Sequence, residues 1–205
     1  MTAQEGGAGP EGVTAVGGGV GWEGGAAGPD QDGDDFVDLP WEALVDHNCF
    51  GCSPKNLSGL RLRFSPHPDG LVTRFRLGRA FESYPGVVHG GILSTICDEA
   101  MGNLLVLRTG KSAFTVTLRM RFVSPLKVDH EYSCVARLRP EESRMGLEHA
   151  AAEILGPTGR PMATATGVYK PVSMDRARDH LVLTDDAAGL LQGALSESSS
   201  KQNGA

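Results

Sequence analysis

The chain has 205 residues, a formal net charge of −6 at pH 7, and a composition that is 40% hydrophobic and 21% charged. This length suits one domain with tails, or two small domains. The sequence contains neither a basic cluster of the kind that lines a nucleic-acid groove nor the roughly 20 consecutive apolar residues of a membrane span. We therefore expect a cytoplasmic protein that binds neither nucleic acid nor membranes.

Both ends of the chain have a composition that predicts disorder. The first 35 residues contain 12 glycines and seven acidic residues but no Lys or Arg, which leaves too little apolar surface to offset the entropy of the chain. They also lack the basic start and apolar core of a signal peptide. Residues 173–205 are again polar, and we expect a largely disordered tail there, although 181–195 could form a short helix. These boundaries predict a single domain over residues 36–172.

The cysteine pattern favours reduced, structural cysteines. Cys49 and Cys52 form a CxxC pair, but no second CxxC or HxxxH accompanies it, as most zinc sites would require. A redox CxxC would be expected at the start of a helix in a βαβ unit, and that context is missing. A metal site with His47 as a third ligand remains an alternative, as does a redox role.

Hydrophobic periodicity predicts one helix and a series of strands. A short amphipathic segment at 36–45, anchored by Trp41, comes first. Alternation of apolar and polar residues then predicts strands at 60–64, 71–77, 114–125, 128–138, 147–155 and 162–172. The first two should pair as a hairpin. In the strand at 114–125, we expect one face to carry Val116, Leu118, Met120 and Phe122, and the other to carry Thr115, Thr117, Arg119 and Arg121.

The predicted helix, from about 91 to 108, organises the domain. It is apolar around most of its circumference, which is typical of a buried helix, and Gly110 is a suitable left-handed cap after its end. Strands and helices do not alternate, so the sheet should be mostly antiparallel. The sequence thus predicts an α+β domain in which a curved sheet of about six strands wraps around one long central helix.

Two adjacent acids, Asp98 and Glu99, lie within this apolar helix and need a reason to be there. Asp98 lies two turns after Gly91 and on the same face, whereas Glu99 points about 100° away. Ser94, Thr95 and Gly102 would make a small polar notch around Asp98. We therefore expect Asp98 to be functional and Glu99 to be a satisfied or edge acid.

The start of the helix is a candidate oxyanion site. The first N–H groups of a helix have no partner within it, and the glycines at 90 and 91 would let a ligand oxygen approach closely. The rise from Gly91 to Asp98 is about 10 Å at 1.5 Å per residue, so one copy is unlikely to bring both onto one carbonyl group. The spacing therefore indicates a site shared between two protomers.

The segment HGGILSTICDEAMG, followed by TVTLRMRFVSP, resembles hotdog-fold acyl-CoA thioesterases of the phenylacetic-acid-degradation type. The upstream NCFGCSPKNLSGL is similar to an element of one branch of that family. The resemblance covers roughly residues 47–172. It implies a hotdog fold, assembly as homodimers or homotetramers with active sites at the subunit interface, acyl-CoA as substrate, and no metal or redox cofactor.

The resemblance also implies roles for individual residues. Asp98 would be the general base or nucleophile. The Gly90 N–H, with Gly91 beside it, would be the oxyanion donor. Thr115, on a strand of the facing subunit, would position the water. Relatives often carry Asn or Gln at the position of Ser83, so this chain departs from the family pattern there. His89 is expected to orient the backbone, with a general-base role as the alternative.

Other functions remain open at the level of sequence. A non-catalytic acyl-CoA binding protein would share the fold, and so would an acyl-thioester hydratase or dehydratase. The hydratase interpretation is weakened because FESYPG precedes the helix, where those enzymes carry a His followed by an apolar segment. Arg119, Arg121 and Lys127 are candidates for binding the CoA phosphates, although exposed basic residues on a strand are more often solubilising.

Overall fold

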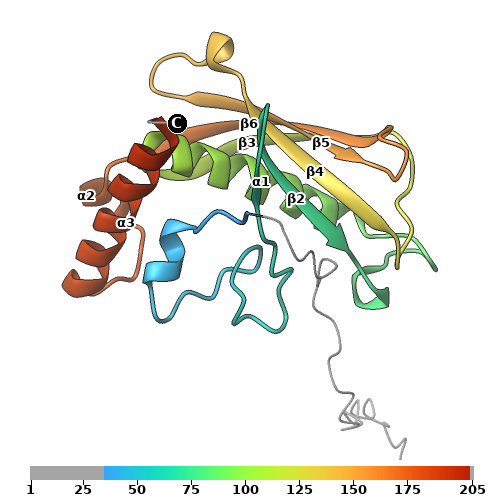
Figure 1. Cartoon of the computed structure of the whole chain (residues 1–205), viewed down its shortest axis with the longest axis horizontal. Helices are drawn as coiled ribbons and strands as arrows, with labels where there is room; N and C mark the ends of the chain where they lie inside the picture. Colours follow the sequence, from blue (N-terminus) through green and yellow to red (C-terminus); the bar gives the residue numbers. More distant parts are fainter. Residues whose placement is uncertain (1–34, 204–205) are drawn as a thin grey trace, which may run out of the picture.

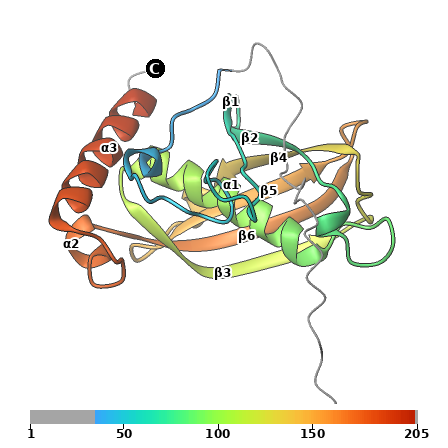
Figure 2. The ribbon, with the colours of Figure 1, turned by 90° about the horizontal axis from the view of Figure 1, so that it is seen from below.

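The computed structural model describes residues 35–203 and contains one six-stranded antiparallel sheet in the order β1-β2-β4-β5-β6-β3. Of the segment 1–35 that was predicted to be disordered, residues 1–34 lie outside the described residues. The sheet curves over the long helix α1 (Figures 1 and 2). The strands are β1 (Ser65–His67), β2 (Gly70–Arg76), β3 (Ser112–Phe122), β4 (Glu131–Leu138), β5 (Glu148–Leu155) and β6 (Pro161–Val172).

Helix α1 (Gly90–Thr109) is the buried centre of the domain, as its apolar sequence predicted. Gly110 ends it in the left-handed conformation, with φ of 64°, and its N–H bonds to the carbonyl of Val106. The central strands β5 and β6 contribute buried alanines at 150, 152, 163 and 165 to the same core. Such small side chains allow a helix to lie close to a sheet. The predicted α+β fold with one central helix is confirmed.

The predicted strand at 60–64 is wrong, although its alternation is real. Leu60, Leu62 and Phe64 are buried, but the backbone turns at Arg61, which has a positive φ of 51°. The N–H groups of Leu60 and Leu62 bond to carbonyls of the loop at 50–51 instead of a strand. The hairpin partner of β2 is the short β1. Periodic burial therefore arose here from an extended loop segment.

Strand β3 also departs from simple alternation. A β-bulge between Thr115 and Thr117 places two residues of β3 opposite one of β6. Val116, expected to face the core, is 56% exposed, whereas Leu118 and Met120 pack against the core as predicted. A bulge shifts the alternation by one residue, so Thr115 faces the same side as Leu118. Strand β3 is one edge of the sheet.

The segment after β6, expected to be a largely disordered tail, is folded over its described part. It forms α2 (Met174–Ala177) and α3 (Asp185–Asn203). Helix α3 packs against α1 and against the short helix η1 (Pro40–Ala43), at one end of the sheet (Figure 1). Leu191 and Leu195 on α3 form a second buried cluster with Val106 of α1. Two further single-turn helices, η2 (Arg79–Phe81) and η3 (Pro140–Glu142), lie in loops.

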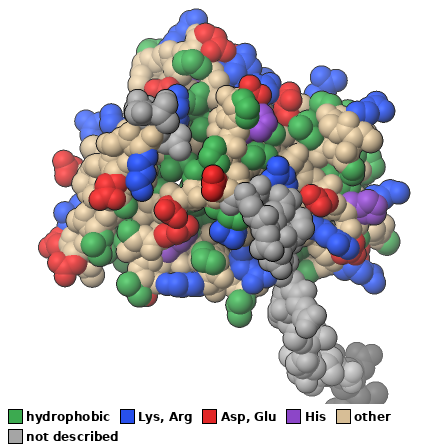
Figure 3. All heavy atoms as spheres, viewed as in Figure 1, with side chains coloured by type: hydrophobic (Ala, Val, Ile, Leu, Met, Phe, Trp, Pro, Cys, Tyr) green, Lys and Arg blue, Asp and Glu red, His purple; other side chains and the backbone are tan. Residues whose placement is uncertain are grey.

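The surface has a mixed charge pattern. Acidic and basic side chains alternate over the face drawn in Figure 3. Within the described part of the chain, none of the helices combines the length and the apolar character needed to cross a bilayer.

Candidate functional site

A cavity of about 360 Å³ lies where α1, β3, β6 and the C-terminal segment meet. Its polar wall is formed by Asp98, Glu99, Thr115 and Tyr169. Its apolar wall comes from Trp41, Leu44, Ala113 and the C-terminal leucines Leu181, Leu183 and Leu191. The cavity therefore joins a pair of carboxylates to a surface suited to an apolar group.

Asp98 is held by two hydroxyl groups of its own chain. Thr115 Oγ1 donates to Asp98 Oδ1 at 2.9 Å, and the Tyr169 phenol donates to the same oxygen at 3.0 Å. Within residues 35–203, no group is bonded to the second oxygen, Oδ2. The carboxylate is thus oriented through one oxygen while the other remains available to a ligand or a water.

Tyr169 was not foreseen from the sequence. It pairs with Thr115 across β6 and β3, and burial, together with the charge of Asp98, raises its pKa, so the phenol remains a donor at neutral and alkaline pH. Gly167 gives its ring room, because a Cβ there would lie 2.5 Å from the ring. In the sequence, the glycine two residues before Tyr169 is the only sign of this arrangement. It could be interpreted only after the pairing of β6 with β3 was known.

The predicted notch around Asp98 is differently built. Ser94 and Thr95 do not face Asp98, because their hydroxyls bond back to the carbonyls of Gly90 and Gly91. Thr115 replaces them, and it does so from the same chain, whereas the resemblance placed it on a facing subunit. Gly102 lines the cavity as expected.

Glu99 is a satisfied acid, as predicted, but it does not lie at an edge. It lines the same cavity as Asp98 and accepts a hydrogen bond of 2.9 Å from Asn103 Nδ2. The Cys49 thiol lies 3.5 Å from Oε1 and 3.6 Å from Oε2. Burial and then the charge of Cys49 raise the pKa of Glu99 to about 7.

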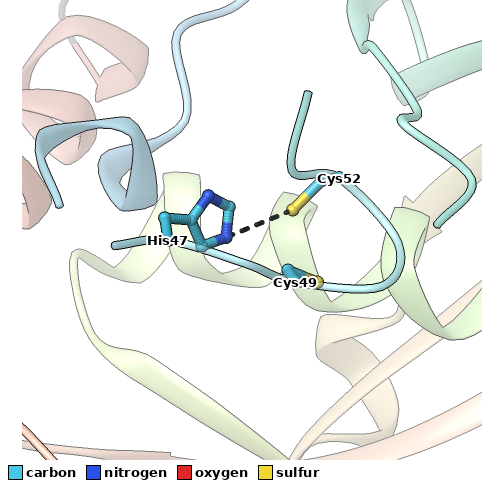
Figure 4. A group of neighbouring side chains, drawn as sticks. All are labelled: His47, Cys49 and Cys52. Atoms are coloured by element: carbon cyan, nitrogen blue, oxygen red, sulfur yellow. Dashed lines mark hydrogen bonds between the residues drawn. The ribbon is translucent and has the colours of Figure 1, made fainter. Parts of the chain in front are cut away.

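The CxxC loop lies directly over Glu99. His47 Nε2 and Cys52 Sγ are 3.9 Å apart, and Figure 4 shows these two side chains turned toward one another with Cys49 beside them. The hydrogen bond from Cys52 lowers the pKa of Cys49 to about 3, and the same bond raises the pKa of Cys52. All four cysteines are free thiols.

The start of α1 forms a separate group of predicted residues. His89 is the N-cap, and its Nδ1 accepts the Gly91 N–H at 2.9 Å. This hydrogen bond caps the start of the helix and occupies the Gly91 N–H. The Gly90 N–H also has no partner within the helix. The ring of Phe122 lies close to Gly90, because a Cβ there would be 3.2 Å from it. The rise from Gly90 to Asp98 is about 12 Å, so the structure does not bring the two together within one chain.

The remaining predicted residues lie outside the cavity. Ser83 is exposed in a turn, where its N–H and hydroxyl bond to the carbonyl of Val87. Arg119 and Arg121 are exposed on β3, as is Lys127 in the loop that follows. None of the three is in contact with Asp98 or Glu99 in the described chain.

Residues 85–141, which contain α1, β3 and β4, match the family model of the thioesterase superfamily. This match assigns that segment to the thioesterase superfamily and agrees with the hotdog architecture of sheet and central helix. No curated protein sequence is significantly similar to this chain.

Solved structures resemble this chain at low sequence identity. A thioesterase superfamily protein is 19% identical over 65% of this chain and 66% of its own, with a TM-score of 0.56. A hypothetical thioesterase from Streptococcus pneumoniae TIGR4, solved with coenzyme A, is 21% identical over 55% of this chain and 86% of its own, with a TM-score of 0.49. The PaaI protein of the phenylacetic acid degradation operon of E. coli is 16% identical over 55% of this chain and 80% of its own, with a TM-score of 0.49.

Proposed function

We propose that this protein is an acyl-CoA thioesterase of the phenylacetic-acid-degradation type, which hydrolyses the thioester bond to a free acid and CoA. The observation that carries the proposal is the Asp98 carboxylate, which lines a cavity with an apolar wall and has one oxygen held by Thr115 and Tyr169. The superfamily match over residues 85–141 supports the same reaction class.

In the proposed reaction, Asp98 acts as general base toward water or attacks the thioester carbon itself. A thioester needs an activated nucleophile and a donor for the oxyanion that forms. Thr115 and Tyr169 fix one carboxylate oxygen, so that Oδ2 is aimed at the substrate. The apolar wall of the cavity suits the acyl group.

The oxyanion donor is proposed to be the Gly90 N–H of a second copy. Because about 12 Å separates Gly90 from Asp98 along one helix, two chains packed with antiparallel helices would complete each site. The free edge of β3 carries the exposed apolar side chains Val116 and Phe122, and the exposed Val123 follows directly. These features support a homodimer as the active unit, with a homotetramer of two such dimers as the larger form.

Release of CoA thiol from a panel of acyl-CoAs with short, long and aromatic acyl groups tests the function. We expect turnover of at least one member by the wild type and a large loss in Asp98→Asn. Binding of acyl-CoA without any turnover would instead identify a ligand-binding protein, and hydration of an unsaturated acyl-CoA would identify a hydratase. No metal is needed for the proposed chemistry.

A further inference from the structure

Three potential metal ligands converge on the loop that precedes β1. The ligand atoms of His47, Cys49 and Cys52 all lie within 4.8 Å of one another. A tetrahedral zinc ion, with bonds of about 2.0–2.3 Å, places its nitrogen, oxygen and sulfur ligands about 3.3–3.8 Å apart. The separation of 3.9 Å between His47 Nε2 and Cys52 Sγ is close to such an edge.

A carboxylate of α1 lies beside these three residues. The carboxylate of Glu99 lies 3.5 and 3.6 Å from Cys49 Sγ, which is again the length of a tetrahedral edge. The approach depends on Gly51, because a Cβ at this position would overlap the Glu99 carboxylate. Glu99 is outside the group of three whose ligand atoms all lie within 4.8 Å of one another, so its carboxylate must move closer to the others to complete a tetrahedron.

The surrounding contacts hold the loop in shape without the metal. Ser53 Oγ donates to the carbonyl of His47 at 2.8 Å, and the Gly51 N–H donates to Cys49 Sγ at 3.2 Å. Asn103 donates to Glu99 and in turn accepts a hydrogen bond of 3.0 Å from Trp41. Partners of this kind orient metal ligands and are part of a metal site.

We propose that His47, Cys49, Cys52 and Glu99 form a structural site for one Zn²⁺ ion. Thiolate, imidazole and carboxylate are the ligands that zinc prefers, and four protein ligands make a closed site. The ion is bound by two thiolates, a neutral imidazole and an ionised carboxylate, and any proton still on these groups is released to solvent. The ion joins the loop to α1 one residue away from Asp98 and so stabilises one wall of the cavity. The proposal does not rest on the proposed hydrolysis, because metal binding is measured directly.

The test is metal content and cobalt spectroscopy on the full chain, purified under reducing conditions and freed of loose metal. We expect one zinc per chain in the wild type and none in the Cys49→Ser/Cys52→Ser double variant. Glu99→Gln should bind zinc at least about tenfold more weakly. The matched controls are Cys134→Ala, which changes a buried cysteine elsewhere, and Asp98→Asn, which changes the neighbouring acid; both should retain one zinc.

Cobalt substitution of the wild type keeps the proposal falsifiable if the cysteine variants fail to fold. Co²⁺ bound by Cys49 and Cys52 should give sulfur-to-metal charge-transfer absorption together with the strong visible bands of a tetrahedral site, and zinc should abolish both. Clearly less than one zinc per chain, cobalt without charge-transfer absorption, or equal zinc loss in Cys134→Ala would each overturn the proposal.

Discussion

Thr115 Oγ1 lies 2.9 Å from Asp98 Oδ1 within one chain, although Thr115 and the core-facing Leu118 are three residues apart on β3. In a regular strand, residues an odd number apart face opposite sides. The bulge at Val116 removes this conflict by shifting the alternation. A single extra residue in an edge strand therefore brings a hydroxyl to the central carboxylate.

Asp98→Asn should lower acyl-CoA hydrolysis by about 10²–10⁴-fold, the usual contribution of a general base. The amide keeps the shape of the side chain, so the circular dichroism spectrum should be unchanged. Glu99→Gln should lose less activity than Asp98→Asn. An equal loss from Glu99→Gln with Asp98 intact would contradict the assignment of the base.

Thr115→Ala should slow hydrolysis by about tenfold, because it removes one donor to an ionised group. The loss should be smaller than that of Asp98→Asn. Thr158→Ala is the matched control, since this threonine is exposed in the turn between β5 and β6 and the same change there should leave kcat unchanged. If the two alanine variants behave alike, the contact between Thr115 and Asp98 has no part in catalysis.

Tyr169→Phe should also lower kcat by about tenfold, by removing the second donor to Asp98. Tyr132→Phe is the control: its phenol accepts the Lys127 N–H and is not bonded to Asp98. We expect the control to change thermal stability more than kcat. If steady-state kinetics show a larger loss of kcat in Tyr132→Phe than in Tyr169→Phe, Tyr169 does not have the proposed role.

Leu191→Ala should destabilise the protein by about 2–5 kcal/mol, the usual cost of truncating a buried leucine. Its side chain is 1% exposed between α3 and α1, whereas Leu190, next to it, is 59% exposed. Leu190→Ala should therefore stay within about 0.5 kcal/mol of the wild type. Denaturant unfolding measures both, and equal stabilities would mean that α3 is not part of the folded core.

A mixture of Gly90→Pro and Asp98→Asn chains should recover activity if sites are shared between copies. Proline is tolerated at the first position of a helix and removes the N–H that is proposed as oxyanion donor. Each variant alone should be inactive, whereas a mixed dimer retains one intact Asp98 opposite one intact Gly90. Coexpression with two affinity tags isolates this mixed dimer, and an inactive mixed dimer would place each site within a single chain.

The sequence alone predicted the central helix, its glycine cap and the strands β2 to β6, because these depend on local periodicity and turn chemistry. It also singled out Asp98 and the CxxC pair, because a carboxylate in an apolar helix and two closely spaced thiols are unusual wherever they fold. The alternation at 60–64 led to a wrong strand prediction, because alternation indicates which side chains are buried and not whether the backbone pairs with another strand.

Contacts between distant segments were decided only by the tertiary structure. The register between β3 and β6 brings Tyr169 and Thr115 to Asp98, and the path of the CxxC loop brings Cys49 to Glu99. The folding of α3 rests on Leu191 and Leu195 meeting Val106, some 90 residues away in the chain. Each of these contacts depends on the packing of segments far apart in the chain. The periodicity of a short stretch of sequence does not show which distant residues it will contact.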